Sequence, residues 1–424
     1  MLQIPYIREN KELVIKGLAR RGVAEAEQKV NNLLQTDEKR RNTQTTLDQA
    51  LAESNQISKQ IGQLMKQGKR DEAEAAKQQT ADLKARSKAL SEELSQHEEA
   101  QQSLLYQLPN VPHPSVPDGR TADDNEVIYE YGLIPELGDD ALPHWDLIEK
   151  YDIIDFKTGN KISGAGFPVY KGKGARLQRA LVNFFLDEAR AAGYTEMQPP
   201  LLVNEASGYA TGQLPDKEGQ MYELVNENLY LIPTSEVPIT NLYCDTILKD
   251  DELPVMNAGY TPCFRREAGS WGADVRGLNR LHQFDKVEIV QIRKPIQSYA
   301  ALEEMTLHAR QLLEKLELPH RVLKLCAGDL GFTAALTYDL EVYSAAQRRW
   351  LEVSSVSNVE TYQANRLKLR YRDEDGKTQL LHTLNGSALA LPRIVAALLE
   401  NNQDAEGVRI PEVLVPYTGF DRIF

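Results

Sequence analysis

The chain has 424 residues, which at about 100 to 200 residues per domain indicates two or three domains with a large buried core. Its 49 Lys and Arg residues and 62 Asp and Glu residues give a net charge of −13, which excludes a general, charge-driven affinity for DNA or other nucleic acid. With 42% hydrophobic and 26% charged residues, the composition is that of a folded globular protein and excludes extensive disorder.

The three cysteines, Cys244, Cys263 and Cys326, lie far apart and form no C-x-x-C pair. This spacing argues against a disulfide framework and against a thiolate zinc site. Residues 1–10 carry charges where a signal peptide needs an apolar core, and no apolar run of about 18 residues occurs. We therefore expect a cytoplasmic protein without a membrane span.

The first hundred residues differ in composition from the rest. Between Pro5 and Pro109 the sequence contains no proline, and the only aromatic residues there lie at the two ends. Gln, Glu, Lys, Ala and Leu, which favour helices, dominate this part. In two stretches, 28–66 and 76–104, residues spaced alternately three and four positions apart form a regular seam. This spacing predicts two helices with heptad seams. The seam positions are Val30, Leu33, Leu47, Leu51, Ile61 and Met65, then Ala76, Thr80, Leu83, Ser87, Leu90, Leu94, His97, Gln101 and Leu104.

A reversal between the two seams predicts an antiparallel helical hairpin. Gly68 suits the C-cap of the first helix and Asp71 the N-cap of the second. Each leg of about 36 residues would extend roughly 50 to 55 Å, so we expect a projecting arm. A coiled coil for dimerisation or a spacer is one interpretation of such an arm. RNA binding is the other, through the basic groups at 39–41, 69–70 and 84–88.

After the arm, the proline-rich segment 109–119 predicts an extended linker, and we expect two domains, residues 1–108 and 109–424. In the second domain, helical spacing covers 173–192 and 297–316. Short strand-like runs that follow one another closely predict an antiparallel sheet, and hence an α+β fold with flanking helices. The runs are 229–232, 287–292, 322–325, 338–343, 350–353 and 367–371.

Five glycines between residues 159 and 174 match neither G-x-x-x-x-G-K-[ST] nor G-x-G-x-x-G. We interpret them as turn residues, so any ATP would be bound without these loops. The segment 261–289 is more informative, because it holds four arginines within sixteen residues of an acidic chain. Its pattern predicts a β-hairpin in which Arg265 shares a face with Glu267, and Phe284 with Glu288. Guanidinium groups bind carboxylates or phosphates and a phenyl ring stacks on a purine, although a solvated charged hairpin is the alternative.

Three further groups could complete a site. Thr234 and Glu236 are two apart, share a face in an extended segment, and could receive an ammonium and a hydroxyl. Carboxylates and hydroxyls at 352–355, with Glu341 before them, are the oxygen ligands that Mg²⁺ takes. A helix that begins near Pro392 would place Arg393 in its first turn, facing an anion. Rim charges in the strands, and a core helix with one surface arginine, are the alternatives.

In this order, the segments resemble the motifs of the class II aminoacyl-tRNA synthetases, and most closely those of the bacterial seryl-tRNA synthetases. The first motif is similar to residues 193–202, with Pro200 at the expected homodimer contact, the second to 264–288 and the third to 385–393. The triplet at 234–236, the run at 352–355 and the helical arm resemble features of the seryl enzymes in particular. The resemblance covers nearly the whole chain.

The resemblance implies a ligase reaction in two steps. Serine attacks the α-phosphorus of ATP to give seryl-adenylate and pyrophosphate, and the 3′-terminal adenosine of tRNA(Ser) then accepts the seryl group. Arg265 is expected to bridge the serine carboxylate and the α-phosphate, Glu267 to hold the adenine edge, Phe284 and Arg393 to enclose the ring, and Arg280 to meet the terminal phosphates. The implied sets are Arg265, Glu267 and Arg393 for catalysis; Thr234, Ser235, Glu236, Arg265, Glu288, Asn385 and Ser387 for serine; Arg265, Arg266, Glu267, Arg280, Leu281, His282, Gln283, Phe284, Glu352, Val353, Ser354, Ser355 and Arg393 for ATP; and Glu352 and Ser355 for Mg²⁺.

The resemblance also gives the arm a partner, the long variable arm of tRNA(Ser), recognised by backbone and shape. Whether tRNA(Sec) is serylated as well stays open. Ala388 and Pro392 depart from the third motif, where glycines are usual. Glu352 and Ser355 are three apart and would face opposite ways in a regular strand, so a shared metal predicts a bulge or a bridging water.

Two other classes of protein remain as alternatives. One is a catalytically inactive, synthetase-like RNA-binding or regulatory protein, against which the presence of Arg265, Glu267 and Arg393 speaks. The other is a structural coiled-coil protein with an inert globular end. Activation of serine separates both from the enzyme.

Overall fold

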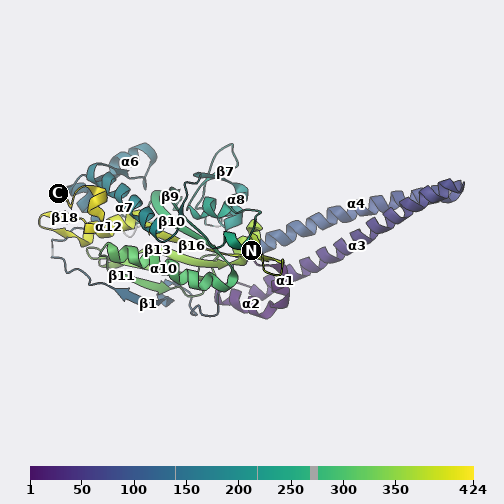
Figure 1. The fold of residues 1–424 in the computed structure, drawn as a ribbon, viewed down its shortest axis with the longest axis horizontal. Helices are drawn as coiled ribbons and strands as arrows, with labels where there is room; N and C mark the ends of the chain where they lie inside the picture. The colour runs from purple at the N-terminus through teal and green to yellow at the C-terminus, as the bar shows by residue number, and fades with distance from the viewer. Residues whose placement is uncertain (139, 217, 268–275) are drawn as a thin grey trace. The chain divides into compact units, whose positions relative to one another are not determined.

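A computed structural model describes residues 1–138, 140–216, 218–267 and 276–424. These residues form two compact units (Figure 1). The smaller unit comprises Leu2–Ala19 and Val23–Pro109, and the larger comprises Asn110–Phe424 with Met1 and Arg20–Gly22. In the part of the chain that is described, no helix combines the length and the apolar character that crossing a bilayer requires.

Two long helices dominate the smaller unit. Helices α3 (Ala26–Lys66) and α4 (Arg70–Tyr106) run side by side in opposite directions, preceded by α1 (Ile4–Glu9) and α2 (Lys11–Arg20) (Figure 1). The 41 residues of α3 correspond to a length of about 60 Å at about 1.5 Å per residue. The predicted antiparallel helical hairpin is therefore confirmed, with longer legs than the seams indicated.

The heptad seam of α3 holds near the base of the hairpin and fails toward its tip. Val30, Leu33 and Leu47 are buried as predicted, but Leu51 and Met65 are 46% and 51% exposed. The prediction was wrong for these two because an α-helix has 3.6 residues per turn, so that strict heptad steps drift around its surface. Small residues fill the inner face instead, as at Ala50 and Ser54.

The turn between the helices follows the predicted position but not the predicted cap. Gly68 has a φ of +76°, the left-handed conformation that glycine adopts readily after a helix end. Helix α4 then begins at Arg70 with Lys69 as its N-cap. The prediction of Asp71 as the N-cap was therefore wrong. Its carboxylate lies in the first turn, where the helix dipole favours a negative charge.

A buried polar group joins the helices near the base. Asp37 is 1% exposed and accepts hydrogen bonds from Arg41, at 3.0 Å, and from Gln101 on α4, at 3.1 Å. Arg40 Nη2 lies 3.6 Å from the same carboxylate. Two members of the basic group at 39–41 therefore help to satisfy a buried charge, whereas Lys84, Arg86 and Lys88 are all exposed.

The larger unit is built on one large sheet, formed in the described residues by eight strands. Neighbouring strands are antiparallel except for the outer pair β4 and β9, which is parallel. The predicted antiparallel sheet is confirmed. In spatial order the strands are β1 (Glu126–Tyr131), β11 (His320–Lys324), β12 (Leu336–Ser344), β13 (Arg349–Glu360), β16 (His382–Ala390), β10 (Gln283–Arg293), β9 (Val255–Phe264) and β4 (Thr195–Glu196).

Helices cover this sheet. α7 (Gly172–Ala191) and α10 (Ser298–Lys315) match the helices predicted at 173–192 and 297–316. They bury the residues that the periodicity picked out, including Leu181, Phe184 and Leu312, in one hydrophobic core with the sheet. The third covering helix is α12 (Leu391–Asn401), and it begins where the sequence predicted, with Pro392 in its first turn.

Shorter elements complete the larger unit. The run at 367–371 was wrongly predicted as one strand, because Leu367 ends α11 (Thr361–Leu367) and the strand β14 begins only at Arg370. The remaining helices are α5 (His144–Lys150), α6 (Phe156–Ser163), α8 (Glu205–Thr211), α9 (Glu236–Asn241) and α13 (Val415–Thr418). The small sheets contain β14 (Arg370–Arg372), β15 (Thr378–Leu380) and β8 (Ile247–Leu248); β5 (Leu202–Asn204), β6 (Tyr222–Glu223) and β7 (Leu229–Leu231); β17 (Gln403–Asp404), β18 (Gly407–Arg409) and β19 (Arg422–Ile423); and β2 (Ile154–Asp155) and β3 (Val169–Tyr170).

Candidate active site

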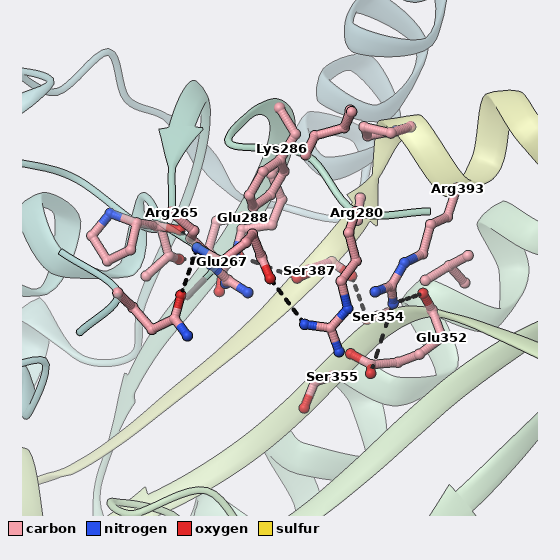
Figure 2. A pocket seen from close by; sticks show the side chains of 18 of the residues that line it. Arg265, Glu267, Arg280, Lys286, Glu288, Glu352, Ser354, Ser355, Ser387 and Arg393 are labelled. Carbon is pink, nitrogen blue, oxygen red and sulfur yellow. Dashed lines mark hydrogen bonds and ion pairs between the residues drawn. The ribbon is translucent and has the colours of Figure 1, made fainter. Parts of the chain in front are cut away.

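One cavity of about 520 Å³ lies against the central strands β13, β16 and β10 (Figure 2). The start of α12 and the segments that follow β7 and β9 also border it. It is lined by Gln213, Glu218, Gln220, Pro233, Thr234, Glu236, Arg265, Glu267, Leu278, Asn279, Arg280, Leu281, Phe284, Lys286, Glu288, Glu352, Val353, Ser354, Ser355, Asn385, Ser387, Ala390, Pro392 and Arg393.

Strand β10 supplies the floor of the cavity. Phe284, Lys286 and Glu288 are two residues apart, and because side chains alternate along a strand they share one face. The predicted pairing of Phe284 with Glu288 on one face is confirmed. The predicted hairpin is also confirmed, since β9 and β10 pair antiparallel from Phe264 opposite Gln283 onward.

The inner part of the cavity consists of Thr234, Glu236, Lys286, Glu288 and Ser387, all of them buried. Lys286 Nζ donates to Thr234 Oγ1 at 2.8 Å and lies 2.6 Å from Glu288 Oε2. Ser387 Oγ lies 3.4 Å from the same carboxylate. A lysine and a carboxylate are thus held in contact away from water.

Glu236 has a second set of partners. Its Oε1 atom accepts hydrogen bonds from Gln363 Nε2 at 2.6 Å and from Asn385 Nδ2 at 2.9 Å. Burial, and next the charge of Glu288, raise the pKa of Glu236 to about 7. Near neutral pH this carboxyl is therefore poised between its two protonation states, and a nearby cation favours the ionised one.

The outer part of the cavity consists of Glu267, Arg280, Glu352 and Arg393, which are partly exposed (Figure 2). Arg280 Nη1 donates to Glu267 Oε2 at 2.9 Å. Arg393 Nη1 donates to the main-chain oxygen of Glu352 at 2.5 Å and lies 3.8 Å from its carboxylate. These guanidinium groups face the cavity and hold carboxylates that another anion can replace.

Arg265 connects the two parts. Its guanidinium carbon lies 5.2 Å from the centre of the Phe284 ring, and its Nε donates to the main-chain oxygen of Pro233 at 3.3 Å. Its charge also acts to lower the pKa of Glu236. Arg265 therefore stands between an aromatic platform and the buried carboxylates.

The metal ligands expected from the sequence lie on the same side of β13. The pairing of β12 with β13 shifts by one residue between Leu340 and Glu341, which leaves Val353 as an extra residue opposite no partner. This β-bulge brings Glu352 and Ser355 to one face, and both line the cavity. The predicted bulge is confirmed.

A second cavity of about 530 Å³ also borders Glu352 and Ser355. Asp339 lines it, and the Oδ1 atom of Asp339 is buried without a hydrogen-bond partner among the described residues. Burial, and next the charge of Glu352, raise the pKa of Asp339 well above its ordinary value. In the described part of the chain, no three His, Cys, Asp or Glu side chains form a metal site by themselves.

Four of the expected residues do not line the cavity. Ser235 is buried and bonds Thr261 Oγ1 at 2.6 Å, and Arg266 is exposed. His282 stacks on Phe167 and bonds the hydroxyl of Tyr222 at 2.6 Å, and Gln283 points to solvent. The other expected residues all line the cavity: Thr234, Glu236, Arg265, Glu267, Arg280, Leu281, Phe284, Glu288, Glu352, Val353, Ser354, Ser355, Asn385, Ser387 and Arg393.

The local structure of two groups differs from the prediction. Arg265 and Glu267 were expected on one face of a strand, but β9 ends at Phe264 and Glu267 has a φ of +46°. The main-chain N–H groups of Arg266 and Glu267 bond Gln220 instead of a neighbouring strand. Thr234 and Glu236 likewise lie beyond β7, since Glu236 opens α9. The alternation of side chains along a strand therefore does not determine where these four side chains lie.

The sequence reasoning assigned no role to several lining residues. Lys286 is the most important of them, and its signal was present because it alternates with Phe284 and Glu288. Gln220 and Asn279 carried no such signal, since neither lies in a periodic element. The glycines between 159 and 174 do not line the cavity, and Gly164 and Gly166 serve turns with φ of +100° and +82°.

Comparison with known proteins gives concordant results. Residues 222–402 match the family described as tRNA synthetase class II core domain (G, H, P, S and T), and residues 1–112 match the seryl-tRNA synthetase N-terminal domain. The serine–tRNA ligase of Salinibacter ruber is 52% identical over 100% of this chain and 99% of its own length.

Solved structures agree as well. The seryl-tRNA synthetase of Pyrococcus horikoshii, complexed with ATP, has a TM-score of 0.93 and 35% identity, covering 100% of this chain and 99% of that one. The cytoplasmic serine–tRNA ligase of Naegleria fowleri, in complex with AMP, has a TM-score of 0.87 and 27% identity, covering 100% and 98%.

The antiparallel sheet with an arginine-lined cavity on its central strands is the core of a class II aminoacyl-tRNA synthetase. Within that class the relatives span the whole length of the chain and share its N-terminal domain. The chain belongs to the seryl-tRNA synthetases.

Proposed function

We propose that this protein ligates L-serine to tRNA(Ser) through a seryl-adenylate intermediate. The observation that carries the proposal is the continuity of the cavity, in which buried carboxylates and a lysine meet three arginines beside an aromatic ring. An amino acid needs the first group of residues and a nucleotide needs the second. The family membership supports the same reaction, and the presence of the arginines argues against an inactive protein.

The inner part of the cavity is suited to serine. Thr234, Glu236, Glu288 and Ser387 offer oxygen atoms to an ammonium and a hydroxyl group, within a space bounded by Lys286. Alanine would leave these buried polar groups unpaired, which makes its rejection strong. Threonine would have to be excluded by lack of space.

The outer part is suited to ATP. We assign Phe284 and Arg393 to the two faces of adenine, Glu267 to its amino edge and Arg280 to the terminal phosphates. Arg265 would bridge the serine carboxylate and the α-phosphate, because it lies between the buried carboxylates and the Phe284 ring. The residues that only border this region are Leu281, Val353 and Ser354.

Glu352 and Ser355 fit Mg²⁺. A carboxylate and a hydroxyl are hard oxygen donors, the bulge turns both to one side, and Asp339 lines the adjoining cavity. Because Mg²⁺ usually keeps phosphate oxygens and waters as further ligands, two protein ligands suffice. When bound, the ion would neutralise charge on the phosphates of ATP.

The reaction needs positioning and charge neutralisation, and it needs no protein nucleophile. The serine carboxylate, already an anion, forms a bond to the α-phosphorus while the bond to the pyrophosphate oxygen breaks. Arg265 holds both reacting groups in line, and Arg280 balances the negative charge that leaves with pyrophosphate. A hydroxyl oxygen of the 3′-terminal adenosine of tRNA then forms a bond to the carbonyl carbon of the adenylate, the bond from that carbon to the phosphate oxygen breaks, and AMP leaves.

We further propose that the helical hairpin of α3 and α4 contacts the variable arm of tRNA(Ser). Its exposed cations Lys84, Arg86 and Lys88 support contact with the phosphate backbone. Deletion of residues 28–104 tests this role, since adenylate formation should continue while tRNA charging is lost. Retained charging would contradict it. An assay of tRNA charging by the full-length protein, with tRNA(Sec) in place of tRNA(Ser), decides whether that tRNA is a substrate.

Two further proposals concern the state of the enzyme. We propose a homodimer through the region of Pro200, where Pro200, Leu201 and Leu202 are exposed. Sedimentation of the wild type and of Pro200→Asp tests it, and a variant that remains dimeric argues against this contact.

We also propose a cytoplasmic location, which suits the three free cysteines.

The central proposal is tested by the exchange of labelled pyrophosphate into ATP with each of the twenty amino acids. Exchange should depend on serine, and alanine and threonine should support far less. Absence of exchange with serine would falsify the assignment. Exchange driven best by another amino acid would keep the class of enzyme and reject the substrate.

A further inference from the structure

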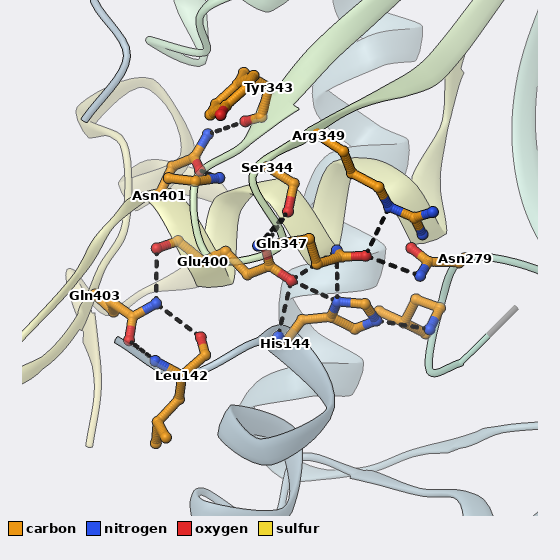
Figure 3. A network of polar contacts seen from close by, with 12 residues as sticks. Leu142, His144, Asn279, Tyr343, Ser344, Gln347, Arg349, Glu400, Asn401 and Gln403 are labelled. Atoms are coloured by element: carbon orange, nitrogen blue, oxygen red, sulfur yellow. Dashed lines mark hydrogen bonds and ion pairs between the residues drawn. The ribbon is translucent and has the colours of Figure 1, made fainter. Parts of the chain in front are cut away.

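A buried polar network lies at the far end of α12, beyond the lining of the cavity (Figure 3). Its centre is Glu400, which is 0% exposed. Glu400 Oε1 accepts hydrogen bonds from the main-chain N of His144 at 2.9 Å, from His144 Nδ1 at 2.7 Å and from Gln347 Nε2 at 2.9 Å. Its other oxygen accepts a hydrogen bond from Ser344 Oγ. Burial alone would raise the pKa of Glu400, but the hydrogen bonds from His144 and Ser344 hold it below its ordinary value.

These contacts select the tautomer of the His144 ring. Nδ1 faces a carboxylate and therefore carries the hydrogen. Nε2 accepts the main-chain N–H of Leu278 at 2.9 Å and therefore carries none. Both ring nitrogens of this fully buried histidine are thus used, one for Glu400 and one for Leu278.

The second contact reaches the cavity, because Leu278, Asn279 and Arg280 line it. Gly277, just before them, packs so closely on the ring that a Cβ atom there would lie 2.2 Å from His144 Nε2. Its φ of +67° also suits glycine. A glycine at 277 is therefore needed for the main chain to approach the His144 ring this closely.

Gln347 extends the support to the next residue. Its Oε1 atom accepts a hydrogen bond from Asn279 Nδ2 at 3.0 Å (Figure 3). The main-chain oxygen of Asn279 in turn accepts a hydrogen bond from Arg393 Nε at 3.2 Å. Arg393 lies in the first turn of α12 and Glu400 lies near its end. One helix therefore carries both a guanidinium that lines the cavity and the carboxylate that holds His144.

We propose that His144, oriented by Glu400, is a positioning residue for nucleotide binding: it holds the main chain of 278–280, and with it Arg393, where adenine and the phosphates of ATP bind. The inference rests on the proposed function for the identity of the nucleotide. It assigns no chemical step to His144. Serine binding should be independent of it, because the hydrogen-bond partners of its ring in the described part of the chain lie outside the inner part of the cavity.

Two substitutions separate the two contacts of the ring. His144→Asn keeps a donor for Glu400 and removes the acceptor for Leu278, whereas His144→Gln offers an acceptor at the position of Nε2. In the pyrophosphate exchange assay we expect His144→Asn to raise the KM for ATP about 10- to 100-fold, the effect of one unsatisfied buried amide. The KM for serine should change less than about twofold, within ordinary surface effects. His144→Gln should recover much of the loss.

His320→Asn is the matched control. His320 is also 0% exposed, but its Nδ1 atom contacts the carbonyl of Leu318, which does not line the cavity. It should leave both KM values unchanged even if it lowers thermal stability as much as His144→Asn does. If His144→Asn does not fold, Gln347→Ala decides instead, since Gln347 is only partly buried. We expect it to raise the KM for ATP about fivefold, the loss of one ordinary hydrogen bond.

An unchanged KM for ATP in His144→Asn, or an equal rise for ATP and serine, overturns the proposal. For Gln347→Ala the same two results count against it. Calorimetric titration of ATP alone into each variant separates this proposal from the proposed function. A wild type that binds ATP but activates no serine contradicts the function, and the ratio of ATP affinities between wild type and variant still tests the positioning role.

Discussion

The inner and outer parts of the cavity treat charge in opposite ways. In the inner part, Lys286 and Glu288 are 6% and 2% exposed and bond each other and their neighbours. In the outer part, the side chains of Arg280 and Glu352 are 49% and 50% exposed. Removal of a buried partner leaves a charge without compensation, whereas water readily replaces an exposed one.

The difference matches what each part must do. A small amino acid is recognised by a preformed set of polar groups, each already oriented by a neighbour. The two terminal phosphates of ATP carry more charge and leave as pyrophosphate, so the arginine that binds them must exchange partners within one catalytic cycle. Arg280, which we assign to these phosphates, rests on Glu267, which holds it in place and can release it.

Arg265, which joins the two parts, should show the largest effect. Arg265→Ala should lower serine-dependent exchange by about 10³-fold or more, because a guanidinium that stabilises charge in the transition state is lost. Thermal unfolding should change little, since among the described residues its side chain donates one hydrogen bond, of 3.3 Å, to Pro233. Near-native exchange in this variant would refute its assignment. The neighbouring Arg266 is the control, as it is exposed and outside the lining, and Arg266→Ala should lose less than about tenfold.

Lys286 tests the rigidity of the inner part. Lys286→Met should lower the free energy of unfolding by about 3 to 5 kcal/mol, because Glu288 is left buried without its cation. Urea unfolding measures the change. The double variant Lys286→Met with Glu288→Met should recover most of it. A loss below about 1 kcal/mol in the single variant would show that the pair behaves like a surface one.

Glu236 should make stability depend on pH. Its pKa is raised from 4.5 to about 7, so the folded chain resists its ionisation. The free energy of unfolding is unaffected by this group below pH 4.5, falls as pH rises from about 4.5 to about 7, and by pH 8 has lost about 3 kcal/mol. Glu236→Gln should remove this decrease. Urea unfolding between pH 4.5 and 8 tests it, with Glu227→Gln, at an exposed site, as the control.

The same group should link serine binding to pH. A bound ammonium favours the carboxylate, so the affinity for serine should rise with pH up to about 7 and then level off. Calorimetric titration of serine measures this dependence. An affinity that falls over this range would contradict the assignment of an ammonium to Glu236.

The smallest effect on stability should come from the outer part. Arg280→Ala removes an exposed ion pair with Glu267, so the free energy of unfolding should change by about 0 to 1 kcal/mol. The KM for ATP should nevertheless rise, because a phosphate contact is lost. A stability loss as large as that of Lys286→Met would remove the contrast between the two parts.

Much of this arrangement could be predicted from sequence, and the reasons differ by residue. Phe284, Glu288 and Arg393 lie in regular elements, where periodicity and a proline-marked helix start determine their direction. The bulge at Val353 could be predicted because Glu352 and Ser355 are three residues apart and lie on one face only if the strand contains a bulge or a water bridges them. The hairpin arm followed from composition, since residues 26–106 favour helices and lack a large core.

The remainder depends on contacts between distant segments. Arg265 and Glu267 lie beyond the end of β9, and the main-chain N–H groups of Arg266 and Glu267 bond Gln220, which lies 46 and 47 residues earlier in the chain. No periodicity encodes this turn. His144 was missed for the same reason, because Glu400 and Leu278, which bond its ring, lie far from it in the chain. Four expected residues, Ser235, Arg266, His282 and Gln283, do not line the cavity, since the resemblance indicates which segment lies at a site and not which way each side chain points.

A crystal structure with a non-hydrolysable seryl-adenylate analogue tests the continuity of the cavity most directly. The seryl group should lie against Glu236, Lys286 and Glu288, with the phosphate replacement beside Arg265 and adenine between Phe284 and Arg393. An analogue bound in the reverse direction, or outside this cavity, would contradict the account.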